Sequence, residues 1–294
     1  MSTPSDPDTD VPVVDAHHHL WDPARADYPW LTDELEPIRR RFGAEDLLPL
    51  LDAAGVDATV LVQTRSSVDE TLEFLATAAS TPRIAGVVGW VDLTSQSVDD
   101  DIAAIRAAPG GERLVGIRHQ VQDEPDPDWL ARPDVRRGLA AVARAGLAYD
   151  LLVRSRELPA ALDAARALPD LRVVIDHLAK PPIASGALSP WAERLAPFGS
   201  LPNAWCKLSG LVTEADWARW TVAGLRPFAD HALAVFGPGR LLFGSDWPVC
   251  LLGARYGHVL ATARALTSGL SEDERAAVFG ATAIEVYGLR VERP

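Results

Sequence analysis

The chain has 294 residues, of which 48% are hydrophobic and 23% are charged, and its formal net charge is −13. This composition is that of an ordinary globular protein, which excludes wholesale disorder, and the length fits one large α/β-barrel domain. The acidic excess, with Arg39-Arg40-Arg41 as the longest basic run, argues against a nucleic-acid partner, because phosphate binding needs clustered Lys and Arg.

The chain begins with MSTPSDPDTD, which is acidic and lacks the basic and apolar regions of a signal peptide. Residues 1–11 are therefore predicted to be a short disordered tail. From residue 12 onward, apolar runs of strand length alternate with segments of helical period. Eight strands are predicted, at 12–18, 58–64, 84–91, 114–121, 147–153, 172–178, 203–210 and 240–246.

The predicted helices follow the strands, and the last of them, at 271–289, opens with a capping-box pattern from Ser271 to Asp273-Glu274. Strands that are almost continuously apolar, each followed by a helix, indicate a parallel sheet buried on both faces. Eight such units predict a single (β/α)8 TIM barrel of the α/β class over residues 12–294. An open doubly wound sheet is the alternative, but its Gly-rich phosphate loop is missing.

Cysteine usage and hydropathy bear on where the protein works. Cys206 and Cys250 are too few for a disulfide framework or a thiolate metal site, which favours a reducing, cytoplasmic location. No run of about 18 apolar residues occurs, so we expect no membrane partner.

Polar residues gather where the predicted strands end, which is the end at which TIM barrels carry their chemistry. Sequentially distant groups are thereby predicted to meet at one rim. In strand order they are His17 and His19, Gln63 and Arg65, Trp90 and Asp92, Arg118 and His119, Asp150, His177, Lys207, and Asp246.

The stretch DAHHHLW carries three of these candidates. Strand alternation predicts that Asp15, His17 and His19 share one face, while Ala16 and His18 point the other way. Two imidazoles on one face can bind the same divalent cation. Histidines satisfied within a polar core are the alternative for an isolated pair, but His177 and Asp246 follow equivalent strands and favour a functional cluster.

Three parts of the sequence each admit two interpretations. Asp246, in FGSDWP, is either a helix N-cap or a ligand and general base, and the histidines favour the latter. Lys207 either binds substrate or extends to solvent. Tyr28 and Trp30, in the first βα loop, form a lid or pack onto the barrel.

The pattern Asp15-x-His17-x-His19, with His177 ending strand six and Asp246 ending strand eight, resembles the amidohydrolase superfamily (amidohydrolase-2 type). The strings DYPWL, VVGWVDL, GIRHQVQDE, YDLLV, DHLAKP, CKLSGLVTEADW and FGSDWPVCLL are similar to its sugar-lactone hydrolase branch, and most similar to the L-fuconolactonase type. The resemblance extends from residue 12 to about residue 288.

The resemblance implies an enzyme, a lactonase that opens a sugar (aldono-) lactone such as L-fucono-lactone to the aldonic acid by attack of an activated water on the carbonyl. A small-molecule lactone is then the partner, and a homo-oligomer stays open. The implied catalytic residues, also the candidate metal ligands, are Asp246, His17, His19 and His177. The implied substrate-binding residues are Trp30, Gln63, Arg65, Trp90, Arg118, His119 and Trp247.

The chain departs from the binuclear pattern of the superfamily. It has Asp150 on strand five where a ligand histidine is common, and Arg118-His119 on strand four where a bridging lysine or glutamate would stand. The resemblance thus implies one divalent metal ion, with zinc as first choice, or none.

Two other functions stay open. A metal-dependent decarboxylase of an aromatic acid in the same superfamily would need a cationic pocket for a carboxylate, and its first motif usually begins with Glu rather than Asp15. A non-catalytic small-molecule-binding barrel would be expected to lack one or more of the implied catalytic residues, and none of them is missing from the sequence.

Overall fold

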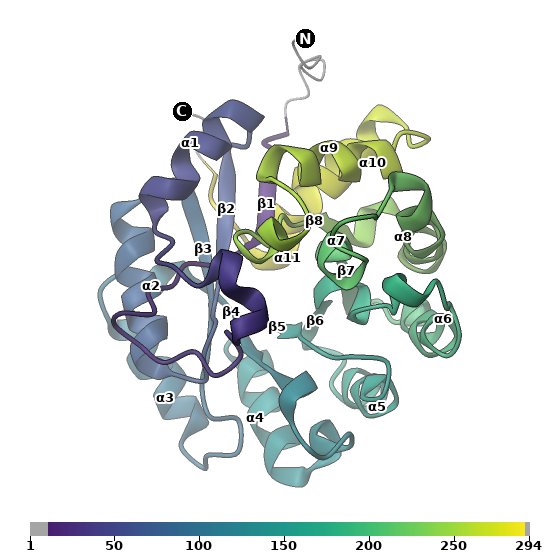
Figure 1. The fold of residues 1–294 in the computed structure, drawn as a ribbon. Helices are drawn as coiled ribbons and strands as arrows, with labels where there is room; N and C mark the ends of the chain where they lie inside the picture. The colour runs from purple at the N-terminus through teal and green to yellow at the C-terminus, as the bar shows by residue number, and fades with distance from the viewer. Residues whose placement is uncertain (1–10, 292–294) are drawn as a thin grey trace.

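The computed structural model describes residues 11–291, in which eight parallel strands form one sheet in chain order (Figure 1). Figure 1 looks along the barrel, with the strands inside and the helices outside. The predicted single (β/α)8 barrel is confirmed, while residues 1–10 of the predicted tail lie outside the described part of the chain. The strands are β1 (Val14–His18), β2 (Ala58–Val62), β3 (Ile84–Gly89), β4 (Leu114–His119), β5 (Ala148–Leu151), β6 (Arg172–Ile175), β7 (Ala204–Leu208) and β8 (Leu241–Phe243).

The helices begin and end at the signals that the sequence carries. Ser67 accepts a hydrogen bond from the amide of Glu70 at the start of α2, and Gly55 ends α1 in the left-handed conformation. The capping box predicted at Ser271 is present, with Glu274 as its partner. The helices are α1 (Ala44–Ala54), α2 (Val68–Ser80), α3 (Val98–Ala107), α4 (Pro133–Arg144), α5 (Leu158–Ala167), α6 (Trp191–Leu195), α7 (Leu211–Glu214), α8 (Val222–Phe236), α9 (Tyr256–Leu266), α10 (Glu272–Ala276) and α11 (Thr282–Tyr287).

Successive strand residues fall into two apolar clusters. Leu61 belongs to the larger cluster, which includes the helices, whereas Val60 and Val62 belong to the smaller one. Val286 and Tyr287 of α11 join the smaller cluster, so the C-terminal helix packs against the barrel interior. Because both faces of each strand are buried, the strand sequences are almost continuously apolar rather than alternating.

The barrel is closed between β1 and the residues that follow β8. The amide of Asp246 donates to the His17 carbonyl at 2.8 Å, and the amide of His19 donates to the Trp247 carbonyl at 2.7 Å. His18 and Trp247 form a parallel bridge at the same seam. The backbone pairing that closes the barrel therefore also brings Asp246 beside His17 and His19.

A β-bulge in β1 overturns one prediction about DAHHHLW. Three steps along β1, from Asp15 to His18, match two steps along β2, so β1 contains one extra residue. The Asp15 carboxylate accepts hydrogen bonds from the Ser245 amide at 2.8 Å and from the hydroxyl of Tyr256, in the outer helix α9, at 3.0 Å. Asp15 thus does not share the face of His17 and His19, because the bulge interrupts the alternation.

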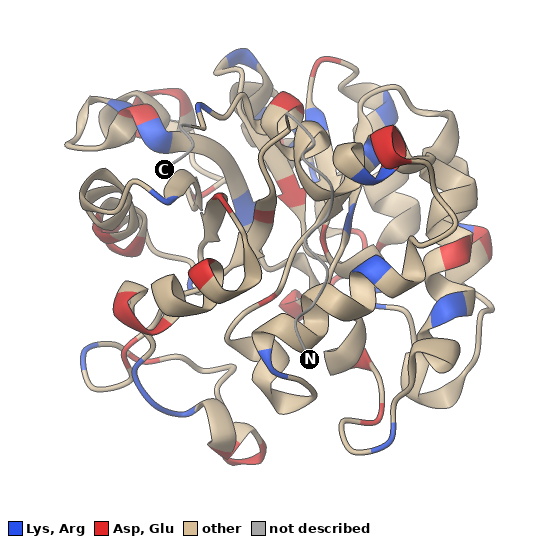
Figure 2. Ribbon diagram, turned by 90° about the horizontal axis from the view of Figure 1, so that it is seen from above, with Lys and Arg blue, Asp and Glu red and all other residues tan. Residues whose placement is uncertain are grey.

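The charged residues are spread over the molecule. In the view of Figure 2, Lys and Arg lie interspersed with Asp and Glu along the helices and loops. Between residues 11 and 291, no helix is long and apolar enough to span a bilayer.

Candidate active site

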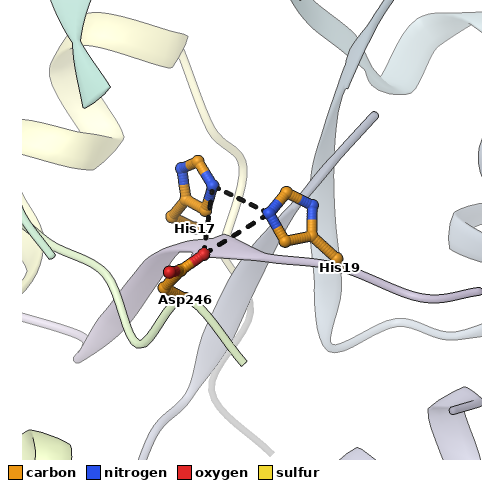
Figure 3. A group of neighbouring side chains, drawn as sticks. All are labelled: His17, His19 and Asp246. Atoms are coloured by element: carbon orange, nitrogen blue, oxygen red, sulfur yellow. Dashed lines mark hydrogen bonds and ion pairs between the residues drawn. The ribbon is translucent and has the colours of Figure 1, made fainter. Parts of the chain in front are cut away.

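Four of the predicted residues converge at the C-terminal end of the strands. His17 Nε2 lies 3.0 Å from His19 Nε2, and these two nitrogens lie 3.8 and 3.5 Å from Asp246 Oδ1 (Figure 3). His177 Nε2 lies 3.8 Å from the same carboxylate oxygen. All four side chains are almost fully buried, and His19, His177 and Asp246 keep slight exposure while His17 has none. Three imidazoles are thus gathered around one carboxylate oxygen.

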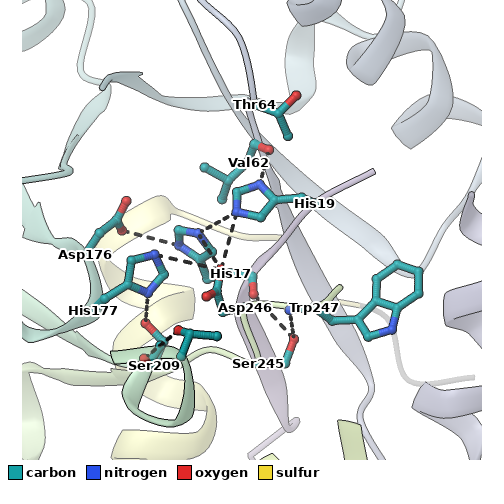
Figure 4. A network of polar contacts seen from close by, with 12 residues as sticks. His17, His19, Val62, Thr64, Asp176, His177, Ser209, Ser245, Asp246 and Trp247 are labelled. Atoms are coloured by element: carbon teal, nitrogen blue, oxygen red, sulfur yellow. Dashed lines mark hydrogen bonds and ion pairs between the residues drawn. The ribbon is translucent and has the colours of Figure 1, made fainter. Parts of the chain in front are cut away.

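Two of these residues have unusual backbone conformations. His177 (φ 52°) begins a run of left-handed residues that extends to Lys180 (φ 49°), and Asp246 has φ 57°. Left-handed non-glycine residues are strained and concentrate at functional sites. His177 Nδ1 lies 2.9 Å from the Ser209 hydroxyl in the next loop, and this contact orients the ring towards Asp246 (Figure 4).

We expect Gly210→Ala to lower kcat and to destabilise the fold by about 1–2 kcal/mol. Gly210 has φ +67°, and a Cβ there would lie 2.7 Å from the His177 ring, so the ring would have to move. Gly146 is the matched control, because it also has φ +67° but no atom within 4 Å of an added Cβ. Gly146→Ala should lower the free energy of unfolding, measured with urea, by about as much as Gly210→Ala does, and it should leave kcat unchanged. Equal kcat in the two variants would contradict this role of Gly210.

The hydrogen bonds of His19 define which of its nitrogens is free. His19 Nδ1 lies 2.8 Å from the Val62 carbonyl, which only accepts, so Nδ1 carries the hydrogen and Nε2 presents a lone pair. His17 Nε2, at 3.0 Å, must then offer a hydrogen, or a cation must lie between the two nitrogens. A tetrahedral zinc site with bonds of about 2.0–2.1 Å has ligand–ligand edges of about 3.3 Å. The separations of 3.0–3.8 Å among His17 Nε2, His19 Nε2 and Asp246 Oδ1 fit such an ion, whereas His177 belongs to a second close group with His17 and Asp176.

A buried network of ions lies behind His17. Asp176 lies 3.0 Å from both Arg118 Nη1 and Lys207 Nζ, and 3.3 Å from His17 Nδ1. Lys207 also pairs with Asp150 at 2.5 Å. The alternative that Lys207 extends to solvent is wrong, because its side chain is fully buried. Two carboxylates and two cations balance one another and hold the Nδ1 edge of the His17 ring, and Figure 4 shows the Asp176 member beside that ring.

The environment sets the protonation states at neutral pH. Burial and the Lys207 ammonium hold the pKa of His17 well below its usual range, and burial lowers the pKa of His177 to about 4. Burial alone would raise the pKa of Asp246, but His177 and His19 outweigh it and hold that pKa below its ordinary value. At neutral pH the cluster therefore combines neutral His17 and His177 rings with an ionised Asp246 carboxylate.

The capping alternative for Asp246 is wrong. Within the described chain, no backbone amide donates to its carboxylate, whose Oδ1 faces the three imidazoles. Ser245 takes the local capping role instead, since its hydroxyl accepts from the Trp247 amide at 3.0 Å.

His18 is separate from this cluster, as the strand pattern predicts. It pairs with Leu61 in the register of β1 and β2, and Leu61 packs towards the helices. Its ring is fully buried, and neither ring nitrogen has a hydrogen-bond partner among residues 11–291. Burial accordingly lowers its pKa to about 3, so the ring is neutral.

Two of the predicted substrate-binding residues are engaged with each other. Arg118 Nε and Nη2 donate to Gln63 Oε1 at 3.1 and 2.9 Å, and Gln63 is fully buried. The remaining nitrogen, Arg118 Nη1, lies 3.4 Å from His17 Nε2. Arg118 is therefore the member of this pair that reaches the histidine cluster.

A second pair of predicted binding residues lies at the ends of β3 and β4. Trp90 Nε1 donates to His119 Nδ1 at 3.1 Å, which leaves the His119 hydrogen on Nε2, 2.7 Å from Glu124. The His119 ring also stacks on Trp129 at 4.3 Å between centroids. His119 is thus held rigidly, and both it and Trp90 remain partly exposed.

The remaining predicted binding residues pack against the barrel. Trp30 Nε1 donates to the Thr64 carbonyl at 3.0 Å, so the first loop is packed down, as one of the two interpretations expected. Arg65 pairs with Glu70 at 3.3 Å and is partly exposed. Trp247 is buried against Phe42, with ring centroids 5.4 Å apart. The Trp247 ring therefore packs in the core beside the cluster rather than on an exposed surface.

Sequence reasoning missed Asp176 and Ser209. A signal for Asp176 was present, since it follows the apolar run of β6 with the parity of Val174, which faces the interior. Ser209 had no comparable signal, because its role depends on a contact between loops.

Comparisons with known proteins agree with this geometry. The sequence model of the Amidohydrolase family matches residues 14–289. An L-fucono-1,5-lactonase from Burkholderia ambifaria is 41% identical over 96% of this chain and 96% of its own, and one from Burkholderia multivorans is 41% identical over 94% and 96%. A crystal structure of an amidohydrolase from Burkholderia multivorans with bound zinc is 38% identical, with a TM-score of 0.90 over 95% of this chain and all of that one. The chain belongs to the amidohydrolase family.

Proposed function

We propose that this protein is a lactonase that hydrolyses a sugar lactone to the aldonic acid. The observation that carries the proposal is the convergence of His17, His19 and His177 on the Asp246 carboxylate. It occurs in a chain that is 41% identical to two L-fucono-1,5-lactonases. L-Fucono-1,5-lactone is therefore the first substrate to test.

In this mechanism Asp246 is the general base. Its Oδ1 faces the imidazoles, so Oδ2 is the atom that takes a proton from the attacking water. The same carboxyl group then returns that proton to the ring oxygen as the carbon–oxygen bond breaks. His177, held by Ser209, keeps Asp246 ionised and oriented, and Arg118 Nη1 supplies positive charge near the carbonyl.

One divalent ion, zinc by preference, is proposed to be held by His17, His19, His177 and Asp246. When bound, it supplies Lewis-acid polarisation of the lactone carbonyl. The support is the free lone pair of His19 Nε2 and the mutual spacing of His17, His19 and Asp246, which suits three ligands of a tetrahedral site.

The partly exposed residues near the cluster are proposed to recognise the sugar hydroxyls. Trp90 and His119 lie at the ends of neighbouring strands, and Arg65 and Trp30 lie beside them, so all four border the same end of the barrel. A cytoplasmic location is also proposed, since Cys206 and Cys250 are both buried as free thiols.

The two other functions are not favoured. The lactonase relatives match almost the full length of the chain, and the first motif carries Asp15 rather than Glu. The binding-only alternative conflicts with the close grouping of His17, His19 and Asp246, which lie within 4.8 Å of one another.

A screen of lactones tests the function. We expect the purified protein to release acid from aldono-lactones such as L-fucono-1,5-lactone, as followed with a pH indicator, with and without chelator. Amide and phosphate ester substrates should give no signal. Amidase or decarboxylase activity without lactonase activity would refute the proposal.

Elemental analysis tests the metal site. We expect at most one tightly bound divalent ion per chain, because the strand-five position holds Asp150, which is already paired with Lys207. Two tightly bound equivalents per chain would contradict this expectation.

A further inference from the structure

Each ring nitrogen of His17 lies between one group that can only donate and one that can only accept. At Nδ1 these are Lys207 Nζ at 3.0 Å and Asp176 Oδ1 at 3.3 Å. At Nε2 they are Arg118 Nη1 at 3.4 Å and the His19 Nε2 lone pair at 3.0 Å. A neutral imidazole has one hydrogen, so His17 can satisfy these neighbours in two alternative ways.

With the hydrogen on Nε2, both short contacts are hydrogen bonds. His17 donates to His19 Nε2, and His17 Nδ1 accepts from Lys207. Lys207 Nζ then donates to both His17 Nδ1 and Asp150, and Asp176 Oδ1 lies 3.0 Å away as its second counter-ion.

With the hydrogen on Nδ1, the arrangement reverses. His17 donates to Asp176, but its Nε2 lone pair now faces the His19 lone pair at 3.0 Å. Such a contact is repulsive unless a cation lies between the two nitrogens. Lys207, fully buried, loses one acceptor at the same time.

We propose that Lys207 is a positioning residue that holds His17 with its hydrogen on Nε2 and thereby competes with a divalent cation for this imidazole. Cation binding moves one proton from Nε2 to Nδ1, where Asp176 accepts the hydrogen bond, and releases none. Without the cation, His17 Nε2–H is a donor beside Asp246. The inference rests on the metal site proposed above.

Zinc affinity tests the competition. Lys207→Met combined with Asp150→Asn removes one positive and one negative charge, so the net charge of the buried network is unchanged. We expect this double variant to bind zinc about 5- to 100-fold more tightly than the native chain, as measured by competition with a chelating dye after metal removal.

Tyr287→Phe is the matched control. It removes the hydroxyl that donates to Asp150 at 2.7 Å but leaves the contact between Lys207 and His17 intact. Its zinc affinity should stay within about 2-fold of the native value.

The position of the hydrogen is a second readout that needs no variant of the network. In ¹⁵N-histidine-labelled, metal-free native protein, we expect His17, assigned by the loss of its signals in His17→Gln, to carry its hydrogen on Nε2. Zinc should move that hydrogen to Nδ1.

The outcomes separate the two proposals. A His17 hydrogen on Nδ1 in the metal-free native chain would overturn the role of Lys207, even if the double variant fails to fold. So would an unchanged zinc affinity in the folded double variant. Failure of both chains to bind zinc would overturn the metal site as well.

Discussion

Asp246→Asn should lower kcat for lactone hydrolysis by about 10²- to 10⁴-fold with the fold intact. The amide has nearly the same size as the carboxylate, and it can still face His19 at 3.5 Å, but it cannot take a proton from water. The left-handed backbone at residue 246 also suits asparagine, which tolerates φ near +57° better than most residues. Steady-state kinetics with circular dichroism of the variant measure both parts of this expectation.

His18→Leu is the control for this prediction. Neither ring nitrogen of His18 has a partner in the described chain, and an apolar side chain of similar size removes two unsatisfied buried groups. The variant should keep kcat within about 2-fold of the native value and lose no stability. Near-normal kcat in Asp246→Asn, or a large loss in His18→Leu, would refute the roles assigned here.

The barrel itself was predictable from local sequence. All eight predicted strands are present, because buried parallel strands leave unmistakable apolar runs between helical segments. Most of the predicted strands extend past the observed C-terminal ends, by three residues at 172–178 and at 240–246. There the chain leaves the sheet in left-handed conformations, at His177 and Asp246, which alternation and apolarity do not reveal.

The candidate site was predictable in its main groups but not in its details. His17, His19, His177 and Asp246 follow from their positions at strand ends, since parallel strands in a barrel bring those ends together. The outward turn of Asp15 depends on the bulge in β1, which is visible only in the pairing with β2.

The buried network behind His17 also lies beyond local sequence patterns. From the local sequence, Lys207 would be expected at the surface. Its burial is explained only by its contacts with Asp150, Asp176 and His17, which lie on or at the ends of three other strands. Long-range contacts of this kind determine charge balance, and they leave no periodic signal.

Asp176→Asn is expected to lower the free energy of unfolding by about 3–5 kcal/mol, measured by urea unfolding at pH 7. The change leaves the fully buried Lys207 and the almost fully buried Arg118 with one carboxylate between them, and the fold excludes the water that would otherwise solvate these cations. Burial alone would raise the pKa of Asp176, but the Lys207 ammonium and the Arg118 guanidinium outweigh it and hold that pKa well below its ordinary value of 3.8. The stabilisation of the fold by ionised Asp176 is therefore complete at neutral pH, and it is lost as the pH falls through the folded-state pKa of Asp176. The free energies of unfolding of the native chain and of Asp176→Asn should accordingly converge below about pH 4.

The exposed pair of Asp99 and Arg144 provides the contrast. Arg144 Nη2 donates to both carboxylate oxygens of Asp99, at 3.0 and 2.8 Å, but more than half of each side chain is open to solvent. Asp99→Asn should therefore change the free energy of unfolding by less than about 1 kcal/mol. The same substitution is thus expected to differ several-fold in its effect on the free energy of unfolding, because Asp176 is buried between two cations whereas Asp99 has one exposed partner. Equal costs for the two variants would show that the network around Asp176 does not hold the barrel together.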